Sequence, residues 1–296
     1  MKVDFFIVGA PKSGTTSLYN YLSQHHSITM SSVKEPNYFS ALDIADQKLY
    51  YNTNLVSDLE AYNSLFNFKS NSCLFGEASV SYLFYQNVAS RIHEYNKNAK
   101  IIIILRDPVK RAFSHYNMDK RLGFVKTSFE NILDDISSKN HLLFYQQYIN
   151  LGFYYSQVKK YIDIFGKDKV CVMLHDDLKI DNAKFTNKIL KFLNLDVDDK
   201  IDFNTPFNTY KSSNYKFINV LYSKSFVRKN ISSLLPNSIL KKINELFFRK
   251  KEISMSKDLE MKLYDLFYED GETVHSSSTK PQPTKHYIRM ANNGIS

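Results

Sequence analysis

The sequence predicts an α/β fold in which helices flank a central parallel sheet, with a mostly helical C-terminal part. Three apolar runs have the composition of buried strands, at residues 3–8, 100–105 and 169–174. Helical periodicity follows each of them, and strands that alternate with helices are typical of a parallel sheet with right-handed crossovers. Ligands of such sheets bind beyond the carboxyl ends of the strands, so we expect the functional site there.

The first strand, residues 3–8, leads into a loop rich in Gly, Ser and Thr, with the sequence GAPKSGTTS at residues 9–17. A helix is predicted directly after it, because Leu18, Tyr21 and Leu22 recur at helical spacing. A strand, a tight loop and a helix together hold a phosphate-like anion, since the loop N–H groups and the helix N-terminus point at one spot.

The letters of this loop differ from those of nucleoside triphosphatases, which read G-x-x-x-x-G-K-[ST]. Gly9 and Gly14 have the required spacing, but Thr15 follows where a lysine is needed, and the lysine lies earlier, at Lys12. This arrangement suits a shorter anion that is bound close to the loop without a metal. A degenerate kinase loop and a plain glycine turn are the alternatives from the loop alone.

The second strand, residues 100–105, is a continuous apolar run, as expected for a strand buried on both faces. Arg106, Asp107 and Pro108 follow, and an Asp before a Pro fits a helix N-cap with Pro at the first helical position. The competing interpretation makes Asp107 a magnesium ligand at the end of a Walker B strand. The predicted helix has one apolar face, formed by Val109, Ala112, Phe113 and Tyr116.

Two segments resemble sulfotransferases that use 3′-phosphoadenosine 5′-phosphosulfate (PAPS). Residues 11–16, PKSGTT, are similar to the family's 5′-phosphosulfate loop, and residues 106–114, RDPVKRAFS, are similar to its 3′-phosphate motif. The resemblance covers roughly residues 1–200. It implies a P-loop-like three-layer fold, PAPS as co-substrate, 3′,5′-ADP as product and no metal.

By this resemblance, Arg106 and Ser114 bind the 3′-phosphate, for which an arginine fork and a hydroxyl are suitable donors. Lys12 stabilises the bridging oxygen as the sulfuryl group departs, and Lys211 is a weaker candidate for closing over the 3′-phosphate. The remaining candidates for the 5′ side of the nucleotide are Ser13, Gly14, Thr15, Thr16 and Ser17.

Glu35 is the candidate catalytic base. Its segment, KEPNYF at residues 34–39, resembles the stretch after the first helix in carbohydrate sulfotransferases of the heparan sulfate type, in which a Glu acts as base. Pro36 is expected to keep Glu35 extended. The alternatives are a surface glutamate paired with Lys34, or a histidine base as in steroid- and phenol-type sulfotransferases, for which the candidates are His115, His25 and His26.

Residues 76–82, GEASVSY, resemble a family segment that lines the acceptor side. Glu77 and Ser79 are therefore candidates for substrate binding, and the alternative is a helix start that Ser79 caps. Ala78 stands where glycosaminoglycan enzymes often carry a lysine, which weighs against a heparan-like acidic polymer as acceptor.

Composition limits the partners. The chain has 296 residues and a net charge of +9, which favours anionic partners such as a nucleotide donor. Lys and Arg are spread along the chain, which disfavours nucleic acid. Of the two cysteines, Cys171 lies in an apolar run as a small hydrophobe; a disulfide with Cys73 is the less favoured alternative, and neither has zinc-ligand spacing.

The C-terminal part is predicted to be helical, with apolar stripes at 239–247 and 259–267. We expect one sulfotransferase domain over residues 1–275 and a mobile tail over 276–296. The first strand leaves no room for a signal peptide, and no apolar stretch approaches 18 residues, so no membrane span and a cytoplasmic location are expected if Met1 is the native start.

The sequence thus predicts a PAPS-dependent sulfotransferase that acts on a hydroxyl or an amine, with a saccharide acceptor favoured and a small molecule as the other option. The rivals are a P-loop nucleotide kinase and an inactive nucleotide-binding protein. Acceptor contacts come from variable loops, so the acceptor, O- against N-sulfation and the oligomeric state stay open at this point.

Overall fold

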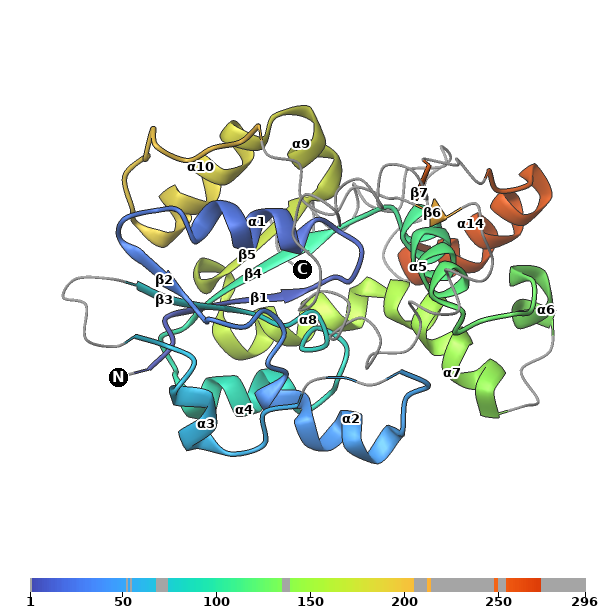
Figure 1. Cartoon of the computed structure of the whole chain (residues 1–296), viewed down its shortest axis with the longest axis horizontal. Helices are drawn as coiled ribbons and strands as arrows, with labels where there is room; N and C mark the ends of the chain where they lie inside the picture. Colours follow the sequence, from blue (N-terminus) through green and yellow to red (C-terminus); the bar gives the residue numbers. More distant parts are fainter. Residues whose placement is uncertain are drawn as a thin grey trace.

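The computed structural model describes residues 2–51, 53, 55–67, 74–134, 139–204, 212–213, 248–249 and 254–272. Its centre is a five-stranded parallel sheet with the strand order β2-β3-β1-β4-β5 (Figure 1). The α/β prediction with a parallel sheet is confirmed. The strands are β1 (Phe5–Gly9), β2 (Ile28–Met30), β3 (Leu74–Ala78), β4 (Lys100–Leu105) and β5 (Val170–Leu174).

Each predicted strand is observed, and the two that were not predicted, β2 and β3, extend the sheet on one side of β1. Strand β1 lies between β3 and β4, with Phe5 opposite Gly76 on one side and Lys100 on the other. Strand β4 pairs with β5 from Ile101–Val170 to Leu105–Leu174. Because these strands are parallel, the segments after β1, β4 and β5 leave the sheet at the same edge.

The alternation of side chains along β1 and β4 explains why the apolar runs are continuous. Phe6 and Val8 contribute to one hydrophobic cluster, whereas Phe5 and Ile7 contribute to another. Ile101 to Ile104 divide between the same two clusters in turn, and all of these side chains are fully buried. Both faces of the sheet are therefore covered, as in other parallel sheets.

Helices cover the sheet on both faces, and a further group lies beyond one end of it (Figure 1). One face carries α1 (Thr15–Leu22), α9 (His175–Ile180) and α10 (Asn182–Leu193). The other carries α3 (Leu59–Asn63), α4 (Val88–Tyr95) and α8 (Tyr154–Phe165). The group at the end consists of α5 (Pro108–Leu122), α6 (Phe129–Asp134), α7 (Lys139–Tyr148) and α14 (Lys257–Glu272), which share a third cluster.

Shorter elements complete the description. These are α2 (Ala41–Gln47), the 3₁₀ turns Tyr38–Ser40, Asn150–Gly152 and Lys167–Lys169, and an antiparallel pair of β6 (Ser212–Ser213) with β7 (Phe248–Arg249).

Helix α5 begins as predicted. A side-chain oxygen of Asp107 accepts a hydrogen bond from the Lys110 N–H at 2.9 Å, and Pro108 occupies the first turn. The other carboxylate oxygen accepts from the hydroxyl of Tyr264, at 3.0 Å, which ties α14 to this cap. Both oxygens of Asp107 have structural partners, and this favours the cap over the magnesium ligand.

The predicted helix at 259–267 is confirmed as part of α14. Several other predictions, namely Lys211, Cys73, the helix at 239–247 and the tail at 276–296, lie outside the described residues. Within the described part of the chain, none of the helices combines the length and apolarity that crossing a bilayer requires. The cytoplasmic location stays a prediction.

Candidate active site

A cleft of about 630 Å³ opens at the carboxyl edge of the sheet. Its walls come from the loop after β1, the segment around Glu35, the turn after β3, helix α5 and the start of α9. Two sequence motifs that are far apart in the chain therefore meet in one cavity. The predicted site residues that line it are Lys12, Gly14, Thr15, Thr16, Ser17, Glu35, Arg106 and Ser114.

Lys12 extends into this cleft from the loop after β1. Its Nζ donates to the Met118 sulfur at 3.3 Å, and a thioether is a weak acceptor. Burial, with smaller effects from Arg121 and Arg106, lowers the pKa of Lys12 to about 8. The ammonium is therefore partly desolvated without a strong partner of its own, which suits an anionic ligand.

Arg106 joins the two motifs, because its Nη1 donates to the main-chain oxygen of Lys12 at 3.0 Å. Three buried polar atoms near these motifs have no hydrogen-bond partner among the described residues: Arg106 Nε, Ser13 Oγ and His175 Nδ1. Unpaired buried groups are costly, so the site fits a ligand that supplies acceptors to it. The phosphate groups of a nucleotide that is phosphorylated at both ends would supply such acceptors.

Gly14 lets the loop turn into α1. Its φ of +87° is in the left-handed region, and a Cβ there would lie 2.6 Å from Leu178 Cδ2 and 3.0 Å from His175 Cδ2. Both the conformation and the space therefore require glycine. Gly14, Thr15 and Thr16, where the loop enters α1, line the cleft, and the N-terminus of a helix is a suitable place for an anion.

His175 was not predicted as a site residue, yet it lines the cleft next to Gly14. Burial, followed by the positive charge of Arg106, lowers its pKa to about 4, so the imidazole is neutral at pH 7. The only signal in the sequence was its position, directly after the third buried strand.

Glu35 lines the cleft and also forms an ion pair with Lys34, with 40% of its side chain exposed. The ion pair of the alternative interpretation is therefore present, and the role of Glu35 as the base stays a prediction. The expectation of an extended Glu35 is wrong, because its φ is +62°. The conformation is fixed by main-chain contacts: Glu35 N–H donates to Ala78 O, and its own oxygen accepts from Asn37 Nδ2, each at 2.8 Å.

Glu77 and Ser79 do not line the cleft, and both are fully buried. The Ser79 hydroxyl donates to Glu77 Oε1 at 2.6 Å, while Tyr62 and Tyr82 donate to Oε2 at 2.8 and 3.1 Å. Burial raises the pKa of Glu77 to about 7. This geometry corrects the predicted acceptor contact, and the alternative of a Ser79 helix cap also fails, because α4 begins only at Val88.

This buried network instead supports the Glu35 segment. Ser79 Oγ accepts from the Asn37 N–H at 3.1 Å, and Tyr82 OH accepts from the Phe39 N–H at 3.3 Å. Residues of the turn after β3 thus fix the backbone of the segment that follows Glu35.

His115 lines the cleft but is only 5% exposed. Its Nδ1 donates to the Gln147 main-chain oxygen at 3.1 Å, and burial lowers its pKa well below the usual range. It is therefore a neutral side chain in the cleft wall, and Glu35 is the more accessible base.

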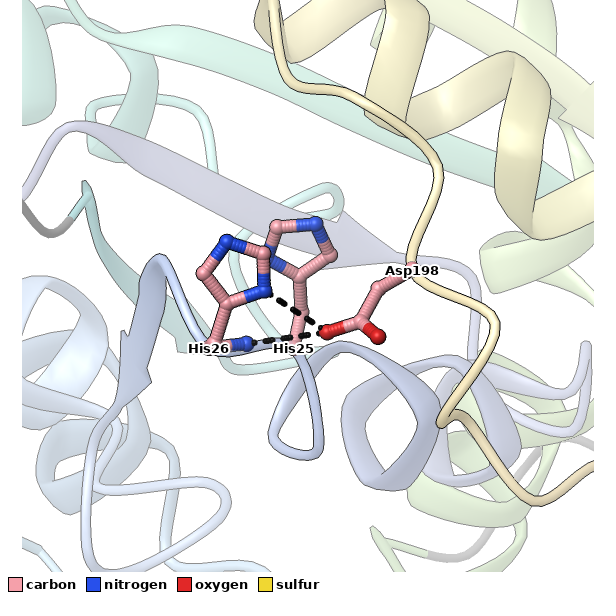
Figure 2. A group of neighbouring side chains, drawn as sticks. All are labelled: His25, His26 and Asp198. Carbon is pink, nitrogen blue, oxygen red and sulfur yellow. Dashed lines mark hydrogen bonds and ion pairs between the residues drawn. The ribbon is translucent and has the colours of Figure 1, made fainter.

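His25 and His26 lie just after α1 and do not line the cleft. With Asp198 they form a group whose ligand atoms lie within 4.8 Å of one another, close enough for a metal (Figure 2). However, His25 Nδ1 accepts from the Ser27 N–H at 3.1 Å and its Nε2 donates to the Asp196 oxygen at 3.0 Å. His26 Nδ1 contacts Asp198 Oδ2 at 2.8 Å. The group therefore joins the segment after α10 to the loop after α1.

Comparison with known proteins gives consistent matches. The profile of the sulfotransferase domain family matches residues 2–251. Human carbohydrate sulfotransferase 15 is 27% identical over 244 residues, which cover 64% of this chain and 43% of that protein. A bifunctional heparan sulfate N-deacetylase/N-sulfotransferase of Caenorhabditis elegans is 27% identical over 211 residues, covering 70% of this chain and 23% of that protein. The chain thus spans less than half the length of these relatives.

A sulfotransferase from Alicyclobacillus acidocaldarius provides a structural match. It has a TM-score of 0.62 and 31% sequence identity, and the match covers 79% of this chain and 91% of the other.

Proposed function

The chain belongs to the sulfotransferase domain family, and on that premise we propose that it transfers a sulfuryl group from PAPS to a hydroxyl or an amine of an acceptor. A saccharide is the favoured acceptor, because the relatives include a carbohydrate sulfotransferase and a heparan sulfate N-sulfotransferase.

One observation carries the proposal: Arg106 donates to the main-chain oxygen of Lys12, so the two anion-binding segments form one cleft. In the proposed complex, Arg106 and Ser114 hold the 3′-phosphate of the donor. The loop from Lys12 to Ser17 holds the 5′-phosphosulfate, with backbone N–H groups and hydroxyls as donors.

Transfer breaks the bond between sulfur and the bridging oxygen of the 5′-phosphate and forms a bond between sulfur and the acceptor oxygen or nitrogen. The bridging oxygen gains negative charge, which the Lys12 ammonium neutralises. The acceptor proton moves to the Glu35 carboxylate, and the second product is 3′,5′-ADP. By analogy with phosphoryl transfer, positioning and charge stabilisation supply most of the rate enhancement.

The rival P-loop kinase requires a lysine at the position of Thr15, and Lys12 approaches the cleft from a different point of the loop. The test is to incubate the purified chain with ³⁵S-labelled PAPS and a panel of hydroxyl and amine acceptors, and to measure label in the acceptor. Lys12→Ala is the matched variant and is expected to lose the transfer. Phosphate transfer from ATP–Mg²⁺ without any sulfate transfer would overturn the proposal.

A further inference from the structure

The cleft extends past the nucleotide-binding segments into a region that we call the acceptor half. It is defined by its aromatic and large aliphatic residues Tyr51, Phe84, Tyr85, Phe124, Leu49 and Leu122, which line the cleft outside both phosphate motifs, together with polar residues such as Asn37, Ser81 and Gln147. Four of the first six side chains are aromatic, and the other two are aliphatic. An apolar wall with aromatic faces is an unusual surface for recognising a highly charged polymer.

The aromatic rings come from three separate segments of the chain and form two pairs. Tyr51 and Phe124 lie 6.2 Å apart between centroids, tilted by 41°, and Phe84 and Tyr85 lie 5.3 Å apart at 71°. All four residues are half-buried, so part of each ring remains accessible.

The tyrosine hydroxyls are tied to neighbouring amides, which orients the rings. Tyr51 OH donates to Gln147 Oε1 at 3.3 Å, and Tyr85 OH donates to Gln47 Oε1 at 2.5 Å. Fixed rings cost less conformational entropy on binding a ligand than mobile ones. The acceptor half is thus prepared for the flat face of a ring.

The charged side chains of the cleft also favour an uncharged acceptor. Lys12 and Arg106 are assigned to the nucleotide. The other Lys, Arg, Asp and Glu residues among the described lining are Glu35, Asp119 and Arg121. Glu35 is itself paired with Lys34, so the net charge of these groups is small. Asp119 is 1% exposed and accepts hydrogen bonds from Tyr50 and Tyr148, the latter at 2.8 Å. An acidic polymer needs a lining rich in Lys and Arg, and beyond the nucleotide side the described lining has Arg121 as its one Lys or Arg side chain.

We propose that the acceptor is an uncharged molecule whose reacting hydroxyl is carried on a ring with an apolar face, such as a neutral sugar or a phenol, and not an acidic polysaccharide. Apolar ring faces pack on Tyr51 and Phe124, while the hydroxyl is directed to Glu35. This inference rests on the proposed sulfuryl transfer and adds the chemical class of its acceptor.

The experiment measures kcat/KM for sulfate transfer from PAPS to three kinds of probe: neutral disaccharides such as cellobiose, 2-naphthol, and a chondroitin sulfate tetrasaccharide. At least one neutral probe is expected to exceed the tetrasaccharide by about tenfold or more. Its rate is expected to change by less than about twofold between roughly 0.05 and 0.3 M salt, since no acceptor charge is screened. Comparison of kcat/KM between the disaccharides and 2-naphthol shows which kind of ring the cleft prefers.

Phe124→Ala is expected to lower kcat/KM for the preferred neutral probe by about tenfold, with 3′,5′-ADP affinity unchanged. Tyr51→Leu provides a second variant, in case the first is poorly folded. Phe192→Ala is the matched control, because Phe192 is a half-buried ring on α10 that does not line the cleft.

Preferential, strongly salt-dependent transfer to the tetrasaccharide would overturn the inference and leave the proposed function intact. Transfer to none of the neutral probes, in a protein that still binds 3′,5′-ADP, would also overturn it. Loss of both nucleotide binding and all transfer would instead contradict the proposed function itself.

Discussion

Arg106 Nη1 donates a hydrogen bond of 3.0 Å to the main-chain oxygen of Lys12, although the two residues are 94 positions apart. The contact is possible because β1 and β4 are neighbours in a parallel sheet, so the segments that follow them leave at the same edge. The loop that we assign to one anion is thereby held by the side chain that we assign to the other. This contact joins the two proposed anion-binding segments in one cleft.

Glu35→Gln is expected to lower kcat by about 10²–10⁴, because an amide cannot accept the acceptor proton. The affinity for 3′,5′-ADP, measured by calorimetry, is expected to stay within about twofold, since Glu35 is assigned to the acceptor side. Glu60→Gln, an exposed glutamate on α3, is the control. Equal activity of the two variants would exclude Glu35 as the base.

Lys12 should give the rate a pH dependence near pH 8. Its pKa is lowered to about 8, mainly by burial, so above this pH the nucleotide-free protein loses the charge that neutralises the leaving oxygen. The value of kcat/KM for PAPS reports the free enzyme and is expected to fall about tenfold per unit above pH 8. In Lys12→Met this limb should be absent and the activity low throughout. A wild-type profile that is flat to pH 10 would contradict this assignment.

Glu77 should make the wild type less stable as pH rises from 5 to 8. Its pKa is raised from 4.5 to about 7 by burial, so between these values the folded state holds a proton that the unfolded chain has lost. The free energy of unfolding therefore falls over this interval, by about 3 kcal/mol from the size of the shift.

Thermal unfolding at several pH values tests this prediction. In Glu77→Gln the pH dependence should shrink, whereas Glu94→Gln, an exposed residue on α4, should retain it. The same slope in all three proteins would show that Glu77 does not titrate as described.

Gly14→Ala tests whether the loop must approach its neighbours closely. Gly123, an exposed residue at the end of α5, is the matched control, since its φ of +78° and ψ of +10° are close to the +87° and +9° of Gly14. Both alanine variants should lose about 1 kcal/mol from the left-handed backbone. Only Gly14→Ala should lose more than this and also bind 3′,5′-ADP more weakly, as measured by unfolding and calorimetry.

The sequence allowed prediction of the elements with the longest apolar runs, since β1, β4 and β5 are buried on both faces and need nothing else to be recognised. The loop at Lys12 and the cap at Asp107 were also predictable, because local backbone geometry restricts their residues. Strand β2 is only three residues long, and β3 contains Gly76 and the buried Glu77, so neither has a strand-like composition.

Long-range partners could not be predicted. The family resemblance makes Glu77 a candidate for the acceptor side, and no local pattern shows that Tyr62 and Tyr82 surround this side chain. Likewise, His175 has no local pattern, and only the sheet order brings it beside Gly14. The left-handed Glu35 is also a tertiary effect, since the contact with Ala78 overrides the local preference before Pro36.

The most direct test of the two-anion site is calorimetry with 3′,5′-ADP and 5′-AMP, which differ only in the 3′-phosphate, without Mg²⁺. The wild type should bind 3′,5′-ADP more tightly by about tenfold or more, as a charge-assisted contact predicts. In Arg106→Ala that preference should largely disappear while 5′-AMP binding changes less. An undiminished preference in the variant, or tighter binding of ATP–Mg²⁺ than of 3′,5′-ADP by the wild type, would contradict the account.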